Sequence, residues 1–317
     1  MEGPVSRAVW RLAWPTMLQN VIAGLQGIID HAMVGHFVGY TANAAIGVSW
    51  QIVLVVMVFV SSLFIGMGVL VARFAGAGDP DKVNRTVYQT LLTTAGLSLG
   101  VLAPVGYFLA PELLGLVNAT PAVQAEALPY LRIIFVSSVG MMLYMVLGGA
   151  LRSAGDARTP LRLGILMTVL NIALNVILIR GVGPIPAFGT KGAALGTVIA
   201  GAVVAVIGLH QLFSGAWVIA LSREMIRGPD PAIIRQLIRF GLPAGFQGVV
   251  MNVAGVLLLR FVGSLEQSAE AQAAYAIAYT ELFSLITWTS VGLLGATAAI
   301  AGQNLGAGRP ERVTEAV

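Results

Sequence analysis

Eight apolar segments follow one another along the chain, and each is long enough to cross a lipid bilayer as a helix. About 20 residues of low polarity are needed, because the hydrocarbon core is about 30 Å thick and each helical residue rises about 1.5 Å. The predicted spans are Leu12–Phe37, Ala44–Phe74, Asn84–Leu109, Ala127–Leu151, Pro160–Ile179, Lys191–Phe213, Gln236–Val262 and Ala271–Leu305. Charged residues make up 10% of the chain, against about 25% in a soluble domain. The sequence therefore predicts an all-α polytopic membrane protein.

The basic residues divide unequally between the two sides of the predicted membrane. Fourteen of the 18 Lys and Arg residues lie on the side of the N-terminus, and four lie on the other side. Because positively charged connections stay in the cytoplasm, we expect a multi-pass protein of a bacterial-type inner (plasma) membrane with a cytoplasmic N-terminus. These charges stand at the ends of spans, so they indicate topology and not a nucleic-acid surface.

An internal repeat organises the predicted spans. Arg11–Pro15 resembles Arg239–Pro243 at an offset of 228 residues, and Gly76–Gly78 resembles Gly306–Gly308 at an offset of 230. Both copies begin on the cytoplasmic side, so the sequence predicts parallel six-helix repeats and a two-lobe fold. The predicted parts are an N-terminal lobe over residues 1–214, a cytoplasmic linker over 215–235 and a partial C-terminal lobe over 236–317. About eight of an expected twelve transmembrane helices would be present, so the chain is expected to be truncated at its C-terminal end.

Two glycine-rich turns carry signals for helix ends. In Gly76–Pro80, the glycines suit the positive φ at which helices end, Asp79 suits a helix cap, and Pro80 suits a first turn. Gly155 and Asp156, followed by Pro160, predict a second turn and cap. We expect these turns to be structural and not to touch a substrate.

Polar residues inside an apolar span are candidates for function, since their burial in lipid is costly. Asp30 is the only acid well inside the first six spans, about 10 Å from the outer surface. Gln19, Gln26 and Asp30 are spaced by seven and four residues, which places them on one helix face. Such a polar stripe is expected to face a wet cavity or another helix.

Three other spans place polar groups at a similar depth. Asn171 and Asn175 lie one turn apart, and Thr197 and Gln51 lie near the outer ends of their spans. One carboxylate among amide and hydroxyl oxygens suits a proton or a hard monovalent cation. Structural alternatives remain: a permanently hydrogen-bonded Asp30, interhelical bonds for the asparagines, and back-bonding of Thr197 to its own helix.

Two motifs resemble the multidrug and toxic compound extrusion (MATE) family. Gly149–Pro160, with the residues GALRSAGDARTP, is similar to the family signature that combines Arg, Gly-Asp and Arg-Thr-Pro. Gln303–Gly308 resembles the family's stretch after the eighth helix. The resemblance implies a cation-coupled (H⁺ or Na⁺) antiporter that exports amphipathic organic cations and drugs by alternating access. It also implies a coupling site at Asp30, Asn171, Asn175 and Thr197, with possible Na⁺ binding there and no other cofactor.

The chain departs from the family pattern at two places. DinF-like members have a second aspartate at the position of Asn175, whereas NorM-like members have asparagine. The NorM-like branch is therefore the better match. A glutamate that NorM-like members carry in the seventh helix is missing around Asn252, and Glu281 in the eighth span is the candidate replacement. The predicted substrate cavity comprises Gln19, Gln26, Gln51, Met141, Tyr144, Asn252 and Glu281.

Other functions were weighed against this one. The chain shows no phosphate-binding loop, no nucleophile–base arrangement and no metal-ligand cluster, and it has no cysteine, so an enzyme is not expected. A lipid-linked saccharide flippase of the same superfamily would need several arginines in its cavity. A non-transporting, truncated membrane subunit remains the other alternative. The expected partners are small amphipathic substrates and the lipid bilayer, not nucleic acid, and the full-length protein is expected to be monomeric.

Overall fold

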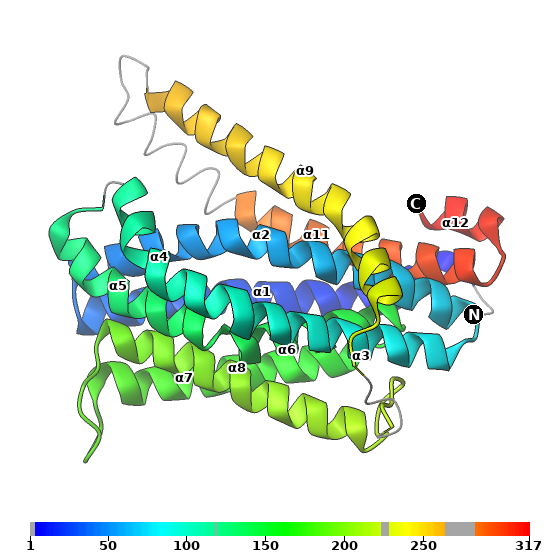
Figure 1. The fold of residues 1–317 in the computed structure, drawn as a ribbon, viewed down its shortest axis with the longest axis horizontal. Coiled ribbons are helices and arrows are strands. Elements are labelled where there is room, and N and C mark those ends of the chain that lie inside the picture. The colour runs from blue at the N-terminus through cyan, green and yellow to red at the C-terminus, as the bar shows by residue number, and fades with distance from the viewer. Residues whose placement is uncertain (1–3, 118, 223–227, 264–282) are drawn as a thin grey trace.

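The structure, a computed structural model of the 317-residue chain, describes residues 4–117, 119–222, 228–263 and 283–317 (Figure 1). The described part is helical apart from its connections and one isolated β-bridge between Val182 and Ile185. Its helices are α1 (Val5–Phe37), α2 (Tyr40–Gly76), α3 (Pro80–Leu97), the π-helical turn η1 (Ser98–Leu102), α4 (Ala103–Leu116), α5 (Pro121–Val136), α6 (Ser138–Ser153), α7 (Arg158–Arg180), α8 (Thr190–Phe213), α9 (Pro231–Gly263), α11 (Phe283–Gly306) and α12 (Pro310–Ala316). The predicted all-α class is confirmed.

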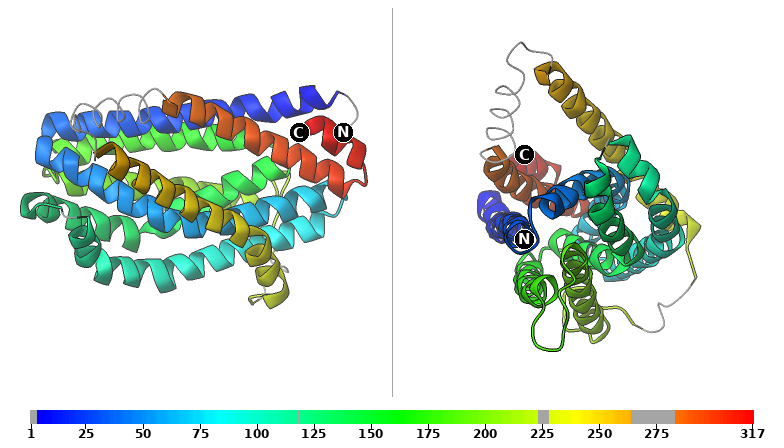
Figure 2. Two further views of the ribbon diagram at one scale, coloured as in Figure 1. Left: turned by 90° about the horizontal axis from the view of Figure 1, so that it is seen from above. Right: turned by 90° about the vertical axis from the view of Figure 1, so that its left-hand side faces the viewer.

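The helices run lengthwise through the molecule, and the start of α1, the α2–α3 turn and α12 lie at the same end (Figures 1 and 2). We call this the inner end, because the sequence predicts that it faces the cytoplasm, and we call the opposite end the outer end. Large apolar side chains such as Leu99, Phe108 and Val206 are more than half exposed on the surface of the bundle. An apolar surface of this kind is suited to lipid and not to water.

Proline begins four of the described helices, at Pro80, Pro121, Pro231 and Pro310. A proline at the first helical position costs no hydrogen bond, because that N–H has no intrahelical partner. Three of these helices, α3, α5 and α9, therefore start several residues before the apolar spans that the sequence predicts. The hydrophobic pattern shows where a chain can cross lipid, and the helix continues beyond it into the polar connection.

Two predicted spans are less regular than expected. The span predicted at Asn84–Leu109 covers α3, η1 and α4, which follow one another without a break and contain one π-helical turn. The span predicted at Ala127–Leu151 is divided into α5 and α6, which are bent by 54°. The bend lies at Ser137 and Ser138, and serine pairs are a known cause of helix kinks.

Length and hydropathy identify several membrane spans within the described residues. Pro80–Leu116, Arg158–Arg180 and Thr190–Phe213 each pass by themselves, and α5 with α6 passes as a bent pair. The first residues of the span predicted at Ala271–Leu305 lie outside the described residues, and α11 is described from Phe283 onwards.

Contacts between distant parts of the sequence follow the internal repeat. Helix α1 packs against α11, α2 packs against α9, and α2 also packs against α11. In the repeat, α9 corresponds to α1 and α11 to α2, so the first two contacts are equivalent and the third joins two equivalent helices. This is the arrangement that a two-fold axis along the helices produces. The predicted division into an N-terminal lobe, a linker and a partial second lobe stays a proposal.

Glycines allow the closest of these contacts. A Cβ atom on Gly76 would lie 1.9 Å from the backbone oxygen of Gln303, and a Cβ atom on Gly306 would lie 1.9 Å from that of Arg73. The two glycines are 230 residues apart, as are Arg73 and Gln303. Helices α2 and α11 therefore touch backbone to backbone at the inner end, through two contacts that the repeat makes equivalent.

Candidate functional site

Four polar side chains from three helices meet in the outer half of the bundle. Asn175 Nδ2 donates a hydrogen bond to Asp30 Oδ1 at 2.7 Å and lies 3.3 Å from Asn171 Oδ1. Asn171 Nδ2 in turn donates to Thr197 Oγ1 at 3.1 Å. The residues come from α1, α7 and α8, and they form one connected chain of hydrogen bonds. We call these four residues the Asp30 cluster.

The local sequence explains this geometry. Asn171 and Asn175 share one face of α7, one turn apart, and both side chains are fully buried. Helix α8 approaches that face closely because residue 196 is glycine: a Cβ atom there would lie 1.9 Å from Asn175 Oδ1. Thr197 also donates to the backbone oxygen of Ala193 at 3.0 Å, so back-bonding to its own helix coexists with its contact to Asn171.

The cluster leaves acceptor capacity unused. Asn175 Oδ1 is buried and accepts no hydrogen bond from the part of the chain that the structure describes, although buried amide oxygens are normally paired. Asp30 is partly buried, and the described residues supply it with no ion-pair partner. A partly buried carboxylate next to an unpaired amide oxygen is suited to a positively charged ligand.

The donor set limits which ligand fits. It offers one carboxylate, two amide oxygens and one hydroxyl, all hard oxygen ligands. Across the described part of the chain, no group of three or more His, Cys, Asp or Glu side chains could hold a metal ion. The arrangement therefore suits a proton or a monovalent cation such as Na⁺ better than a multivalent metal.

A second polar network lies nearer the inner end. Gln19 Nε2 donates to the Tyr144 hydroxyl at 3.1 Å, and Arg152 Nη1 donates to Gln19 Oε1 at 3.0 Å. The sequence pointed to Gln19 and Tyr144 as cavity residues. It pointed to Arg152 only as a topology signal and as the Arg of the family motif, and not as a cavity residue.

The remaining predicted cavity residues are dispersed. Gln26 accepts a hydrogen bond from the Thr168 hydroxyl at 2.9 Å. Met141 lines a small apolar cavity of about 20 Å³ between α2, η1, α5, α6 and α8. Gln51 is exposed on α2, apart from the described hydrogen bonds of the Asp30 cluster. The side chain of Asn252 and the whole of Glu281 lie outside what the structure describes.

A contact beside Asp30 was also missed. His31 Nδ1 and Asn43 Oδ1 lie 2.6 Å apart and join α1 to α2 across their connection. The polar character of both residues was the available signal, but their closeness in space depends on the sharp turn between the two helices.

The comparisons decide the family. The MatE family model matches residues 15–177 and 243–317, which is more than half of the chain. The chain belongs to the MATE family. MATE proteins are multi-pass membrane transporters and not enzymes, and the sequence prediction of the family is confirmed. The two turns Gly76–Pro80 and Gly155–Pro160 fit within these matched regions as caps between helices.

MATE relatives and structures cover this chain almost completely. It is 29% identical over 315 residues to the probable multidrug resistance protein NorM of Thermotoga maritima, covering 98% of this chain and 65% of that protein. It is 26% identical over 316 residues to the probable multidrug resistance protein YoeA of Bacillus subtilis, covering 98% and 67%. The outward-facing conformation of a multidrug resistance MATE family transporter superposes with a TM-score of 0.89 at 22% identity, covering 99% and 68%. The chain thus spans about two thirds of the length of these proteins.

Proposed function

We propose that this chain is part of a MATE antiporter that exchanges H⁺ or Na⁺ for amphipathic organic cations and drugs. The observation that carries the proposal is the Asp30 cluster, with its hydrogen-bonded carboxylate and its unpaired amide oxygen. Substrate and coupling ion are not specified by the family. The names of the relatives, both described as probable multidrug resistance proteins, support drugs as the exported class.

Asp30 is proposed to hold the coupling cation and to release it during exchange. The Asp30 carboxylate accepts a hydrogen bond from Asn175, which keeps the side chain oriented toward α7. A bound cation would take oxygens from Asp30, Asn171, Asn175 and Thr197, and Asn175 Oδ1 would gain the partner that it lacks. Binding therefore changes how strongly α1 is held against α7 and α8. A ligand shifts a conformational equilibrium only when it prefers one state, and this difference in contacts supplies that preference.

The position of α1 connects the cluster to the opposite half of the molecule. One face of α1 carries Asp30 and Gln19, while other parts of the helix pack against α11. Asn20 Nδ2, for example, donates to the backbone oxygen of Trp288 at 3.1 Å. A cation that moves α1 relative to α7 would therefore also act on α11, which belongs to the proposed second lobe.

The decisive experiment replaces the carboxylate. In a protein that contains this chain, reconstituted into vesicles, Asp30→Asn keeps the size and one acceptor oxygen but removes the charge. We expect cation-driven transport of a fluorescent organic cation to fall to the level of protein-free vesicles. Separately imposed sodium and pH gradients would identify the coupling ion.

Glu126→Gln is the matched control. Glu126 is another partly buried acid of the same half, and it accepts a hydrogen bond from the Thr190 hydroxyl on α8, a bond that a glutamine oxygen can also accept. Transport should persist in this variant. Unchanged coupled transport in Asp30→Asn, or transport that follows neither gradient in the unmodified protein, would contradict the proposal.

A further inference from the structure

A cavity at the inner end lies apart from the Asp30 cluster and has a different chemistry. It measures about 430 Å³ and opens between the start of α1, the α6–α7 turn, α11 and α12. This volume lies within the range of about 300–1,000 Å³ that small-molecule sites occupy. The polar residues of its wall are Arg7, Arg11, Gln303, Asn304 and Arg312.

The wall of this cavity is positively charged. Three of its residues are arginines, and none of the described residues that line it is Asp or Glu. Within the described ranges, Arg7 and Arg11 form no ion pair. Guanidinium groups bind phosphate through paired hydrogen bonds, with both charge and geometry matched.

Asn304 adds a second requirement for a ligand. Its side chain is 2% exposed, and its Nδ2 donates to the backbone oxygen of Ile300 at 2.9 Å. Its Oδ1 is buried and receives no hydrogen bond from the described residues. The neighbouring Gln303 directs its Nε2 to the backbone oxygen of Ser153 at 2.8 Å. A ligand that carries a donor, such as a hydroxyl, besides its negative charge would complete the hydrogen bonding of Asn304.

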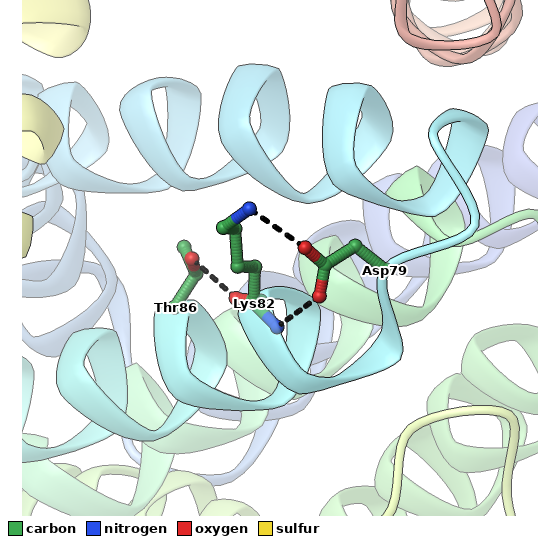
Figure 3. Close-up of polar contacts among 3 residues, drawn as sticks. All are labelled: Asp79, Lys82 and Thr86. Atoms are coloured by element: carbon green, nitrogen blue, oxygen red, sulfur yellow. Dashed lines mark hydrogen bonds and ion pairs between the residues drawn. The ribbon is translucent and has the colours of Figure 1, made fainter.

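The α11–α12 turn beside this cavity has an equivalent in the first copy of the repeat, the α2–α3 turn. In the first copy, Asp79 pairs with Lys82 at 2.8 Å and caps α3, as Figure 3 shows. The Lys82 ammonium also lies 5.7 Å from the centre of the Phe74 ring. The hydrogen bond from Lys82 lowers the pKa of the Asp79 carboxyl, so this pair stays charged but neutral in sum. In the first copy, Asp79 therefore neutralises the positive charge of Lys82.

The second copy keeps the base but differs at the acid and at the aromatic ring. At the offset of 230 residues, Arg309 replaces Asp79, Arg312 replaces Lys82 and Asn304 replaces Phe74. The acid has become a base, and the aromatic ring has become an amide that lines the cavity. Each lining arginine has a basic equivalent in the repeat, so the difference in charge between the copies comes from Arg309, which stands where the first copy has the neutralising Asp79.

We propose that this cavity binds a phosphate ester that carries a free hydroxyl, with the phosphate on the arginines and the hydroxyl on Asn304 Oδ1. A glycerol phosphate group has this chemistry, whether it is the headgroup of phosphatidylglycerol or a soluble ester. Anionic lipids attract basic residues at the cytoplasmic membrane surface, where the sequence predicts this end. A ligand here joins α1 to α11 and α12, which holds the two halves of the molecule together at the inner end.

Lipid binding to the purified chain tests the site. Native mass spectrometry would compare retention of phosphatidylglycerol with that of phosphatidylcholine of the same acyl chains. Soluble glycerol 3-phosphate would be tested separately, through the thermal unfolding of the chain in detergent. We expect selective binding, and we expect Arg7→Gln with Arg11→Gln to weaken it by about thirtyfold, at about five- to sixfold for each basic residue.

The repeat supplies the matched control. Arg235→Gln with Arg239→Gln removes the two equivalent arginines, which are exposed on α9 and do not line the cavity. Binding should be unchanged in this control. Arg309→Asp keeps all three lining arginines, restores the acid of the first copy next to Arg312, and should weaken binding even if the double variant fails to fold.

Each outcome either distinguishes a lipid ligand from a soluble ester or rejects the proposed site. Selective phosphatidylglycerol binding that follows this variant pattern supports a lipid, and binding of glycerol 3-phosphate alone with the same pattern supports a soluble ester. Equal retention of both lipids without glycerol 3-phosphate binding, or equal losses in the two arginine pairs, would overturn the proposal.

Discussion

At the scale of single residues, the Asp30 cluster depends on a glycine, Gly196, which has no side chain beyond a hydrogen atom. Gly196 lets α8 lie against the amide of Asn175, with room for nothing larger than hydrogen. Asn175 holds the Asp30 carboxylate, so the orientation of that carboxylate depends on a residue of α8 that is not itself a ligand. Glycine at this position is a requirement of close helix packing, which membrane helices use widely.

The first prediction tests this dependence. Gly196→Ala would place a methyl group 1.9 Å from Asn175 Oδ1, so the amide must move and its 2.7 Å bond to Asp30 must lengthen or break. We expect a destabilisation of about 1–3 kcal/mol from overpacking, together with a loss of cation-dependent protection against thermal unfolding. Gly27→Ala on α1 is the control, because a Cβ atom there meets nothing within 4 Å. Identical behaviour of both variants would show that Asn175 does not orient the carboxylate.

The sequence was informative about these residues for a physical reason. A carboxylate and two amides are costly inside an apolar helix, so their presence and their depth could be predicted before any fold was known. Arg152 could not be found in this way. The space for its guanidinium comes from Gly148, where a Cβ atom would lie 3.3 Å from Nη1, and its partner Gln19 is 133 residues away.

At the scale of elements, the α5–α6 bend lies next to the π-helical turn η1. Ser98 at the start of η1 and Ser138 at the start of α6 are both buried, and their hydroxyl oxygens lie 2.6 Å apart. Each hydroxyl is the partner of the other, so the two irregular elements are joined by one hydrogen bond. Neither the bend nor the π-helical turn could be predicted from hydrophobicity, because both spans have the composition of a continuous helix.

The second prediction concerns this bond. Ser138→Ala leaves the Ser98 hydroxyl buried without its partner, whereas Ser98→Ala with Ser138→Ala removes both groups. A double-mutant cycle on the free energy of unfolding should give a coupling of about 0.6 kcal/mol, and at most about 1.7 kcal/mol, as found for hydrogen bonds between membrane helices. Strictly additive single effects would mean that the two hydroxyls do not stabilise one another.

At the scale of the whole molecule, the internal repeat explains which helices pack against one another. It predicted that α1 and α9 are equivalent, and the structure pairs α1 with α11 and α2 with α9 accordingly. The contact points themselves were not predictable, since they depend on crossing angles. Near the inner half of α9, a Cβ atom on Gly241 would lie 1.8 Å from the backbone oxygen of Ser62. The outer half of α9 leaves α2, as Figure 1 shows, and carries exposed side chains such as Leu257 and Phe261.

The last prediction concerns the inner contact between α2 and α11, where backbone meets backbone at Gly76 and Gly306. Gly76→Ala would bring a methyl group to 1.9 Å from the Gln303 oxygen, and real Cβ atoms essentially never approach within 3.0 Å. The two helices must therefore separate by at least about 1 Å, and Gly306→Ala should act equally because the repeat makes the two contacts equivalent. Separation at this end favours an inward-open state over an outward-open one, so the two substitutions should shift the population in the same direction.

Since the chain has no cysteine, spin labels can be placed without prior substitutions. Asp81→Cys and Glu311→Cys are exposed, equivalent in the repeat, and lie on α3 and α12 just beyond the contact. The distance between the labels should lengthen by about 1–2 Å or gain a longer component, as expected for helix shifts at an interface. Gly96→Ala, where a Cβ atom meets nothing within 4 Å, should leave the distribution unchanged. If one glycine variant lengthened the distance and the other did not, the two halves would not open about a common axis. The two contacts would then be equivalent in structure but not in how they control opening.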